Sequence, residues 1–517
     1  MKNIKLLISI GELLLGEEEF MTQYHFYYDE SEHSRKINLN TVTSDNYYDN
    51  FIAAFVGWKS ENENSIFDNY VLFEEKYSDR KSKGELKSQT LKQKYFYNGF
   101  ASMNKENICF IDDFLSLFDE NISIYFAVIS KIEFIISQIF DGYENSFMHD
   151  MDAMKYSIVK AILMYRPKEI IERVFENTGE LIDALKAFFE ERIEKNKLDL
   201  ALKQKESKNF REILEVLNDI SDVNTINWDY NIAFLGFKQY LTYRQIKNPN
   251  LIIDKEGNSN TLNAAKYVGF NTAIEIDSKD SVGVRISDMF AGLISKLLKS
   301  LHNSLRYDSS NDKPEKKLLN QKWFSLTEEQ FELYKKMYNI ICKSNNDLYK
   351  TFLSKYSDDL IVFIALLNYM NQFSSAEELK QDINMQSEYF NTCACKYLED
   401  YFSKMRNKLP INFITSDEKD FFLNQRNAKV FFDVQRQPLL KVPNGSYKCH
   451  VLSIGFSKEG IPLATIAERG GNYCYRLPNT LSEWAMSVVG FANMGTNLFP
   501  AEVVFTKDND KIYADIL

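Results

Sequence analysis

Four aspartates lie beside apolar stretches in different parts of the chain. They are Asp29 after residues 24–28, Asp254 after residues 251–253, Asp277 after residues 273–276, and Asp288 in an apolar helical stretch that begins near Val284. A carboxylate beside an apolar run is costly unless it is paired or bound to a metal. Carboxylates that converge from separate strands and helices are typical of sites where two Mg²⁺ or Mn²⁺ ions, roughly 3.5–4 Å apart, hydrolyse a phosphodiester.

Three short motifs surround these acids. They are Asp29-Glu30-Ser31, then Gly84-Glu85-Leu86-Lys87-Ser88, then Asp277-Ser278-Lys279 running into Ser287-Asp288-Met289-Phe290-Ala291-Gly292. In these motifs, over about residues 21–305, the chain resembles the domain-of-unknown-function 3800 family. The resemblance implies an RNase H-like fold with a nuclease-type metal site. The last motif is the most specific of the three.

The resemblance also implies a role for individual residues. Asp29, Glu85, Asp254 and Asp288 would be the catalytic acids and the ligands of Mg²⁺ or Mn²⁺. Lys87 and Lys279 would contact substrate phosphates as point charges. Two other residues are alternative candidates for the acidic site. Glu30 lies beside Asp29, and Asp277 could take the place of Asp254 as the third acid.

Three departures from the family pattern complicate this assignment. The family commonly has Gln and Ala where this chain has Arg285 and Ser287, and Glu32-His33 follows Ser31 in place of a small residue. His33 is near enough to Asp29 in sequence to be an auxiliary ligand, but a surface histidine is the more common outcome.

The spacing of apolar residues predicts the elements that position these side chains. Strands are expected at residues 24–28, 51–58, 70–73, 122–128, 251–253 and 272–276. Helical spacing is found over residues 85–97 and from Val284 onward. Residues 144–218 are amphipathic throughout, which predicts an all-helical insertion. These elements fit the α/β RNase H-like domain that the resemblance implies for residues 21–305, with the helical insertion at about residues 144–218.

The remainder of the chain lies outside the resemblance. The polar residues 307–317 are the best candidate for a linker and for the first proteolytic cut. Residues 318–410 are expected to be helical. Residues 425–517, with alternating strand-length runs and several glycines, predict a small, mainly β domain.

Composition limits where the protein works. No apolar run reaches the roughly 20 residues of a membrane helix, and six scattered cysteines lack zinc-finger spacing. Both observations favour a cytoplasmic protein. Residues 16–19, Gly-Glu-Glu-Glu, correspond to a purine-rich tract upstream of Met21, which predicts that translation starts at Met21.

The formal net charge of −11 does not favour a protein that coats nucleic acid. Any nucleic-acid surface must then be local, for example the basic residues 80–94. The leading hypothesis is a metal-dependent nuclease acting on DNA or RNA, with a protein partner for the C-terminal region and, by association only, a toxin or phage-defence role. The alternative is a non-catalytic RNase H-like binding protein.

Overall fold

The computed structural model describes most of the chain. The described residues are 23–32, 37–42, 44, 47–141, 143, 151–176, 180–218, 220, 231–257, 259–305, 318–343, 358–406, 421–423, 429–431, 438–456, 461–469, 471–493, 496, 498–508 and 511–517. The start at Met21, His33 and the linker at residues 307–317 lie outside them. The chain divides into two compact units, Met1–Asp141 with Lys155–Leu398, and Gly142–Met154 with Glu399–Leu517.

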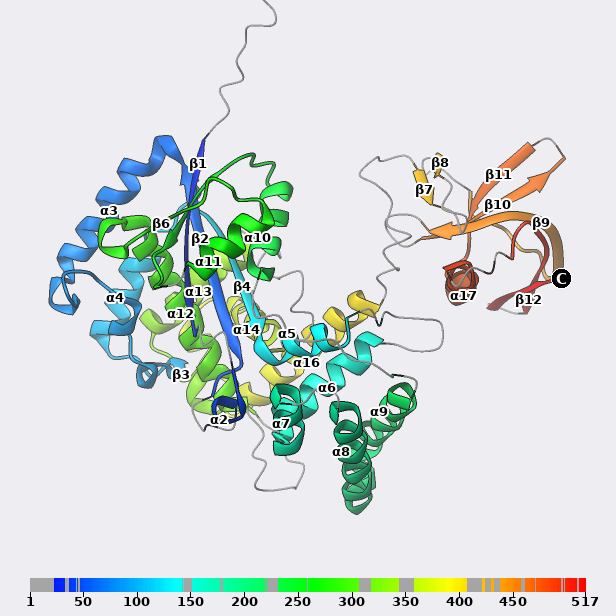
Figure 1. Ribbon diagram of the computed structural model, residues 1–517, viewed down its shortest axis with the longest axis horizontal. Helices are drawn as coiled ribbons and strands as arrows, with labels where there is room; N and C mark the ends of the chain where they lie inside the picture. The colour runs from blue at the N-terminus through cyan, green and yellow to red at the C-terminus, as the bar shows by residue number, and fades with distance from the viewer. Residues whose placement is uncertain are drawn as a thin grey trace, which may run out of the picture. The chain divides into compact units, whose positions relative to one another are not determined.

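A five-stranded mixed sheet organises the first unit (Figure 1). Its strands, in spatial order, are β4 (Ser123–Ser130), β2 (Asn50–Lys59), β1 (Tyr24–Ser31), β5 (Asn250–Asp254) and β6 (Ile274–Ile276). β4, β2 and β1 are antiparallel neighbours, whereas β1, β5 and β6 run parallel. The expected strands near residues 24, 51, 122, 251 and 272 are thus confirmed, and the first strand lies at the centre of the sheet.

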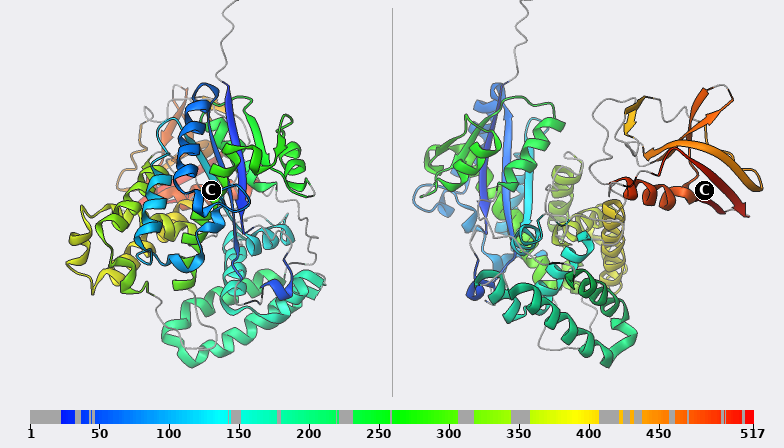
Figure 2. Two further views of the ribbon diagram at one scale, coloured as in Figure 1. Left: turned by 90° about the vertical axis from the view of Figure 1, so that its left-hand side faces the viewer. Right: turned by 45° about the vertical axis from the view of Figure 1, so that its right-hand side comes forward.

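Alternation along β1 divides its side chains between two cores. Tyr27 packs into one core, whereas Phe26 and Tyr28 pack into the other. The first core contains residues of α3 (Glu63–Lys76), α4 (Lys105–Leu115) and α12 (Val282–Leu305). The second contains residues of α10 (Ile232–Tyr243) and α11 (Asn260–Val268). Helices therefore cover both faces, as Figure 2 shows from two sides.

Helices from the second half of the chain join the first of these cores. Phe331 and Tyr334 of α13 (Glu328–Tyr338) and Phe363 of α14 (Asp358–Asn371) are fully buried there. The Tyr334 hydroxyl accepts a hydrogen bond from the Phe100 amide at 3.3 Å. The helical residues that follow position 318 therefore pack with the α/β sheet as one unit up to Leu398.

The remaining elements of this part of the chain are mostly helical. They are α2 (Leu39–Val42), β3 (Tyr97–Phe100), α5 (Lys131–Ile139), α6 (Met151–Tyr165), α7 (Lys168–Glu176), α8 (Leu181–Asn196), α9 (Leu200–Asn218), α15 (Ala376–Lys380) and α16 (Gln386–Arg406). Within residues 144–218, α8 packs on α9 through Phe189 and Phe210, whose ring centroids are 4.8 Å apart. The expected insertion is helical wherever it is described.

Two local expectations are wrong. Residues 70–73, expected as a strand, lie in the helix α3, because a four-residue apolar run does not distinguish a strand from one face of a helix. Residues 85–97, expected as a helix, form two short 3₁₀ turns that lead into β3. The side chains of Lys87 and Ser88 are held there by hydrogen bonds to residues about 200 positions away, so tertiary contacts override the helical spacing.

The second unit contains an antiparallel sheet, as expected for residues 425–517. Its strands, in spatial order, are β11 (Gly471–Arg476), β10 (Pro462–Glu468), β9 (Gly445–Phe456), β12 (Ala501–Asp508) and β13 (Lys511–Ile516). A separate pair is formed by β7 (Phe421–Leu423) and β8 (Lys429–Phe431). The helix α17 (Ser482–Asn493) buries Ala485, Val488 and Val489 at helical spacing against the sheet.

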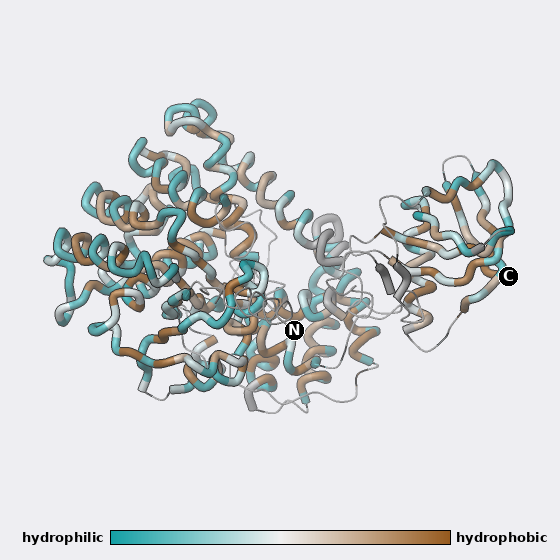
Figure 3. The backbone as a smooth tube through the Cα atoms, turned by 90° about the horizontal axis from the view of Figure 1, so that it is seen from above, coloured by the Kyte–Doolittle hydropathy of each residue, from teal (hydrophilic) through white to brown (hydrophobic). Residues whose placement is uncertain are grey.

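Hydrophobic and hydrophilic residues alternate along the helices, as the colouring in Figure 3 shows. This alternation is typical of helices that bury one face. Among the helices that the structure describes, none is long and apolar enough to cross a membrane.

Candidate functional site

Asp29 and Asp254 lie at the ends of adjacent parallel strands. The register pairs Tyr28 with Ile253, so Asp29 and Asp254 occupy the next position along both strands. Asp29 shares the face of Tyr27, and Asp254 shares the face of Ile252, by the two-residue alternation of a strand. Tyr27 and Ile252 both pack into the core beneath α12. The two carboxylates therefore leave the sheet on the same side, toward α12.

Asp288 reaches this edge from α12. The helix lies close to β1, because the Ser287 hydroxyl donates to the Tyr27 carbonyl oxygen at 2.7 Å and Gly283 faces the Tyr27 ring. Asp288 is held by Ser88, whose backbone N–H donates to Oδ2 at 2.8 Å and whose hydroxyl donates to Oδ1 at 2.7 Å. Two strands and one helix thus bring three carboxylates together.

Asp29 and Asp254 lie close enough to other carboxylates for the charge of those carboxylates to raise their pKa values. Burial raises the pKa of Asp29 well above its ordinary value, and the charges of Asp288 and then Asp254 raise it further, against a hydrogen bond from the Glu30 amide. Burial also raises the pKa of Asp254, a shift that the charge of Lys87 opposes and that of Asp288 reinforces. Like charges that share a site favour the protonated form in this way. Without a cation, the cluster is mutually repulsive.

Glu85 and Lys87 border this cluster. Glu85 is buried, and its Oε2 accepts a hydrogen bond from the Ser278 hydroxyl at 2.8 Å. The Lys87 amino group donates to the same hydroxyl at 2.7 Å and lies 3.4 Å from Glu85 Oε2. Burial lowers the pKa of Lys87, but the charges of Glu85, Asp288 and Asp254 outweigh this and raise it. Lys87 therefore stays protonated beside the acids.

A buried ion pair supports the loop before α12. Arg285 Nε lies 2.8 Å from Glu74 Oε1, and both side chains are less than a tenth exposed. The same guanidinium donates to the carbonyl oxygens of Ser278 at 2.8 Å and Lys279 at 3.1 Å. Arg285 thus fixes the turn that carries Ser278.

Other predicted residues lie apart from the cluster. Asp277 is exposed and accepts a hydrogen bond from the Lys279 amide at 3.0 Å, so it caps the 3₁₀ turn before α12. The Lys279 side chain is also exposed. Glu30 points to the opposite face of β1 from Asp29, where it accepts a hydrogen bond from the Tyr28 hydroxyl. Asp254, not Asp277, is therefore the third carboxylate.

Sequence reasoning missed Lys296. It lies two helical turns after Asp288 on α12, and its amino group is 3.4 Å from the Gly292 carbonyl oxygen. Burial lowers the pKa of Lys296, although the charges of Asp288 and Glu32 oppose this shift. A single lysine in an amphipathic helix gives no signal in the sequence, because solvated helix faces carry many lysines.

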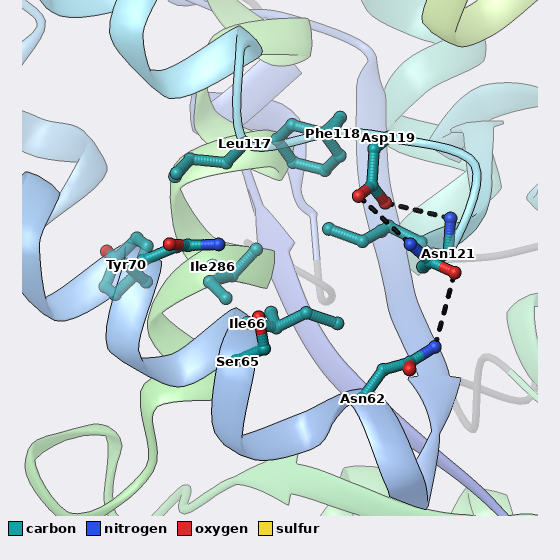
Figure 4. A pocket seen from close by; sticks show the side chains of 11 residues that line it. Asn62, Ser65, Ile66, Tyr70, Leu117, Phe118, Asp119, Asn121 and Ile286 are labelled. Atoms are coloured by element: carbon teal, nitrogen blue, oxygen red, sulfur yellow. Dashed lines mark hydrogen bonds between the residues drawn. The ribbon is translucent and has the colours of Figure 1, made fainter.

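A pocket away from the acids is drawn in Figure 4. It opens between α3, the loop before β4 and α12, and Figure 4 shows Asn62 and Asn121 hydrogen-bonded at its rim. Asp119 is its only carboxylate, and its side chain is held by Asn121. This pocket contains none of the predicted site residues, so it is not the candidate site.

The donor set suits a hard cation. Carboxylate oxygens are the ligands that Mg²⁺ and Mn²⁺ prefer, and a cation would relieve the repulsion that raises the pKa of Asp29. Over the part of the chain that the structure describes, no three His, Cys, Asp or Glu side chains already stand at metal-binding spacing. Asp288 is oriented by Ser88 in this arrangement.

Comparisons with known proteins add nothing to this geometry, since no family model, no curated protein and no solved structure matches the chain. The resemblance to the domain-of-unknown-function 3800 family therefore stays a prediction.

Proposed function

We propose that this protein is a metal-dependent nuclease with an RNase H-like domain. The observation that carries the proposal is the convergence of Asp29, Asp254 and Asp288 from two adjacent parallel strands and the helix across them. Carboxylates that converge from separate elements can hold the pair of metal ions that metal-assisted phosphodiester hydrolysis uses.

Each side chain has a distinct part in this proposal. Asp29, Asp254 and Asp288 would hold Mg²⁺ or Mn²⁺, which when bound supplies an activated water and neutralises developing charge. Glu85 is the fourth acid, held at the border of the site by Ser278. Ser88 orients Asp288 through two hydrogen bonds.

Nucleic acid as the substrate rests on local positive charge. Lys87 remains protonated beside the three carboxylates and can contact a phosphate oxygen. Lys83, Lys92 and Lys94 in the same segment have exposed side chains. These lysines add positive charge to the segment that carries Glu85 and Lys87, on a chain of net charge −11.

Metal titration and nuclease assays test the proposal together. Mn²⁺ and Mg²⁺ are expected to raise the thermal unfolding midpoint of the full chain, and the Asp29→Asn variant should lose this shift. Cleavage of labelled DNA and RNA strands should require the metal and should be lost in the same variant. Asp277→Asn is the matched control, because it removes an exposed acid that caps a turn. A wild-type chain that neither binds these ions nor cleaves either strand contradicts the proposal.

A second candidate is a non-catalytic binding protein with the same fold. The observation that favours it is the state of Asp288, since both of its carboxylate oxygens already accept hydrogen bonds from Ser88. On this hypothesis the ions would not stabilise the protein, whereas a nucleic acid strand would still bind. A gel-shift assay combined with a cleavage assay in Mn²⁺ distinguishes the two candidates, because binding of a strand without metal-dependent cleavage is expected only for the second.

A further inference from the structure

One face of α12 carries a line of residues that leads away from the acids. Asp288, Gly292, Lys296 and Lys299 follow one another at intervals of four, four and three residues, which places them on one side of the helix. Lys299 is already paired, since its amino group lies 3.1 Å from Glu32 Oε1. Lys296 lies between this ion pair and the acid cluster.

The amino group of Lys296 points back toward the acids. Long side chains on a helix lean toward its N-terminus, and Lys296 Nζ lies 3.4 Å from the carbonyl oxygen of Gly292, one turn earlier. Gly292 follows Asp288 by four residues, which is roughly 6 Å along the helix axis. The cation is therefore about one turn from the level of the Asp288 carboxylate.

Among the residues that the structure describes, the Lys296 amino group has no carboxylate at salt-bridge distance, and its hydrogen bond to the Gly292 carbonyl oxygen is long, at 3.4 Å. Its side chain is partly buried, and burial lowers its pKa. A partly buried cation is costly without a counter-charge. In the metal-free protein the nearby charge of Asp288 offsets part of this cost. A metal bound to Asp288 would remove that compensation, so Lys296 would then need another anion.

Lys87 and Lys296 approach Asp288 from different ends of α12. Lys87 donates to the hydroxyl of Ser278, which precedes the helix, whereas Lys296 lies two turns after Asp288. The charge of Asp288 acts on both amino groups. A nucleic acid strand carries one phosphate about every 3.4 Å of duplex axis. A strand whose reacting phosphate lies at the acids would therefore bring a neighbouring phosphate within reach of Lys296.

We propose that Lys296 binds a phosphate next to the reacting one, so that the substrate strand runs along α12 from Lys87 past Asp288 toward Lys299. This inference rests on the proposed nuclease function and adds to it the direction of the strand and a residue that selects polymers over single phosphodiesters.

The test compares two substrates in Mn²⁺. A labelled single strand, tried as DNA and as RNA, has neighbouring phosphates, whereas bis(4-nitrophenyl) phosphate has none. Lys296→Met removes the charge and keeps an unbranched apolar side chain, and Lys296→Arg keeps the charge. Lys266→Met is the matched control, since Lys266 is exposed on α11, which packs on the opposite face of the sheet.

Lys296→Met is expected to raise the KM for the strand about tenfold more than it changes hydrolysis of the small diester, because a charged phosphate contact is lost. Lys296→Arg should restore most of the difference, and Lys266→Met should cause none. The slope of the logarithm of the strand-binding constant against the logarithm of the salt concentration should also become shallower by about one unit in Lys296→Met. Equal effects on both substrates, or no effect on either, overturn the inference while leaving the nuclease proposal intact. If the wild type hydrolyses neither substrate, the nuclease proposal itself fails.

Discussion

Ser88 lies directly against Gly292 and holds Asp288 with two hydrogen bonds, one from its amide at 2.8 Å and one from its hydroxyl at 2.7 Å. A Cβ atom at position 292 would lie 2.3 Å from the Ser88 Cβ and 2.6 Å from its Oγ. The glycine thus allows a turn from residues 88–90 to approach α12 closely. The orientation of Asp288 depends on this close approach.

Gly292→Ala should consequently be destabilising. The added methyl group cannot fit without moving Ser88, so we expect the free energy of unfolding to fall by about 1–3 kcal/mol. Gly257→Ala is the matched control, because a Cβ at Gly257 meets nothing within 4 Å. Urea titrations of both variants measure the difference. Equal stability of the two would show that the turn at Ser88 can move away without cost.

Asp29→Asn should stabilise the metal-free protein. The folded-state pKa of Asp29 is raised by burial and by the charges of Asp288 and Asp254. A raised carboxyl pKa favours folding at low pH, and this contribution is lost as the pH rises through the folded-state value. At neutral pH the wild-type charge therefore opposes folding, by about 1.4 kcal/mol for each unit of difference.

The measurement is thermal unfolding in a chelator, at neutral pH and near pH 4. The gain of Asp29→Asn over wild type should be large at neutral pH and should shrink toward the acid end. In Mn²⁺ the order should reverse, because only the wild type keeps the full set of ligands. A loss of stability in the chelator would instead indicate a paired, structural carboxylate.

Glu74→Gln should be among the most destabilising single changes near the site. It leaves the buried guanidinium of Arg285 without its carboxylate, and breaking a buried pair typically costs about 3–5 kcal/mol. Glu75→Gln, one residue later and exposed, is the control. Unfolding by urea compares the two variants. If Glu74→Gln costs no more than its control, water or another acid must replace the lost partner.

The sequence was sufficient to predict the acids that follow strands. Asp29 and Asp254 each come directly after an apolar run, and such runs form the buried strands β1 and β5. The sequence could not decide between Asp254 and Asp277, because the decision depends on how β1 and β5 are aligned in the sheet. Only the pairing of Tyr28 with Ile253 brings Asp254 beside Asp29.

Contacts between distant residues explain what the sequence could not predict. Glu74 and Arg285 are 211 positions apart, and no local pattern links them. The segment at residues 85–97 has helical spacing, yet Ser88 bonds with Asp288 from 200 positions away and the segment forms turns instead. Lys296 is a candidate phosphate-binding residue only because the fold brings its amino group within 3.4 Å of the Gly292 carbonyl oxygen, one helical turn from Asp288.

The last prediction concerns His302, near the C-terminal end of α12. Its Nδ1 lies 3.0 Å from Asp359 Oδ2, and Asp359 also accepts a hydrogen bond from Asn50 at 2.6 Å. Burial alone would lower the pKa of His302, but the charge and hydrogen bond of Asp359 outweigh it and raise the pKa above the ordinary 6.5. The pair therefore stabilises the fold fully below pH 6.5, and this contribution is lost as the pH rises through the folded-state pKa.

His302→Gln should then lower the free energy of unfolding by about 3 kcal/mol near pH 6 and by clearly less near pH 9. The reason is that only the protonated imidazole forms an ion pair with the buried Asp359. His450→Gln is the matched control, since His450 contacts Glu502 at 2.9 Å in the C-terminal sheet, where both side chains are more than two fifths exposed. Urea titrations at the two pH values give the comparison. A cost for His302→Gln that does not change with pH would mean that the imidazole is neutral in the folded protein and acts only as a hydrogen-bond donor to Asp359.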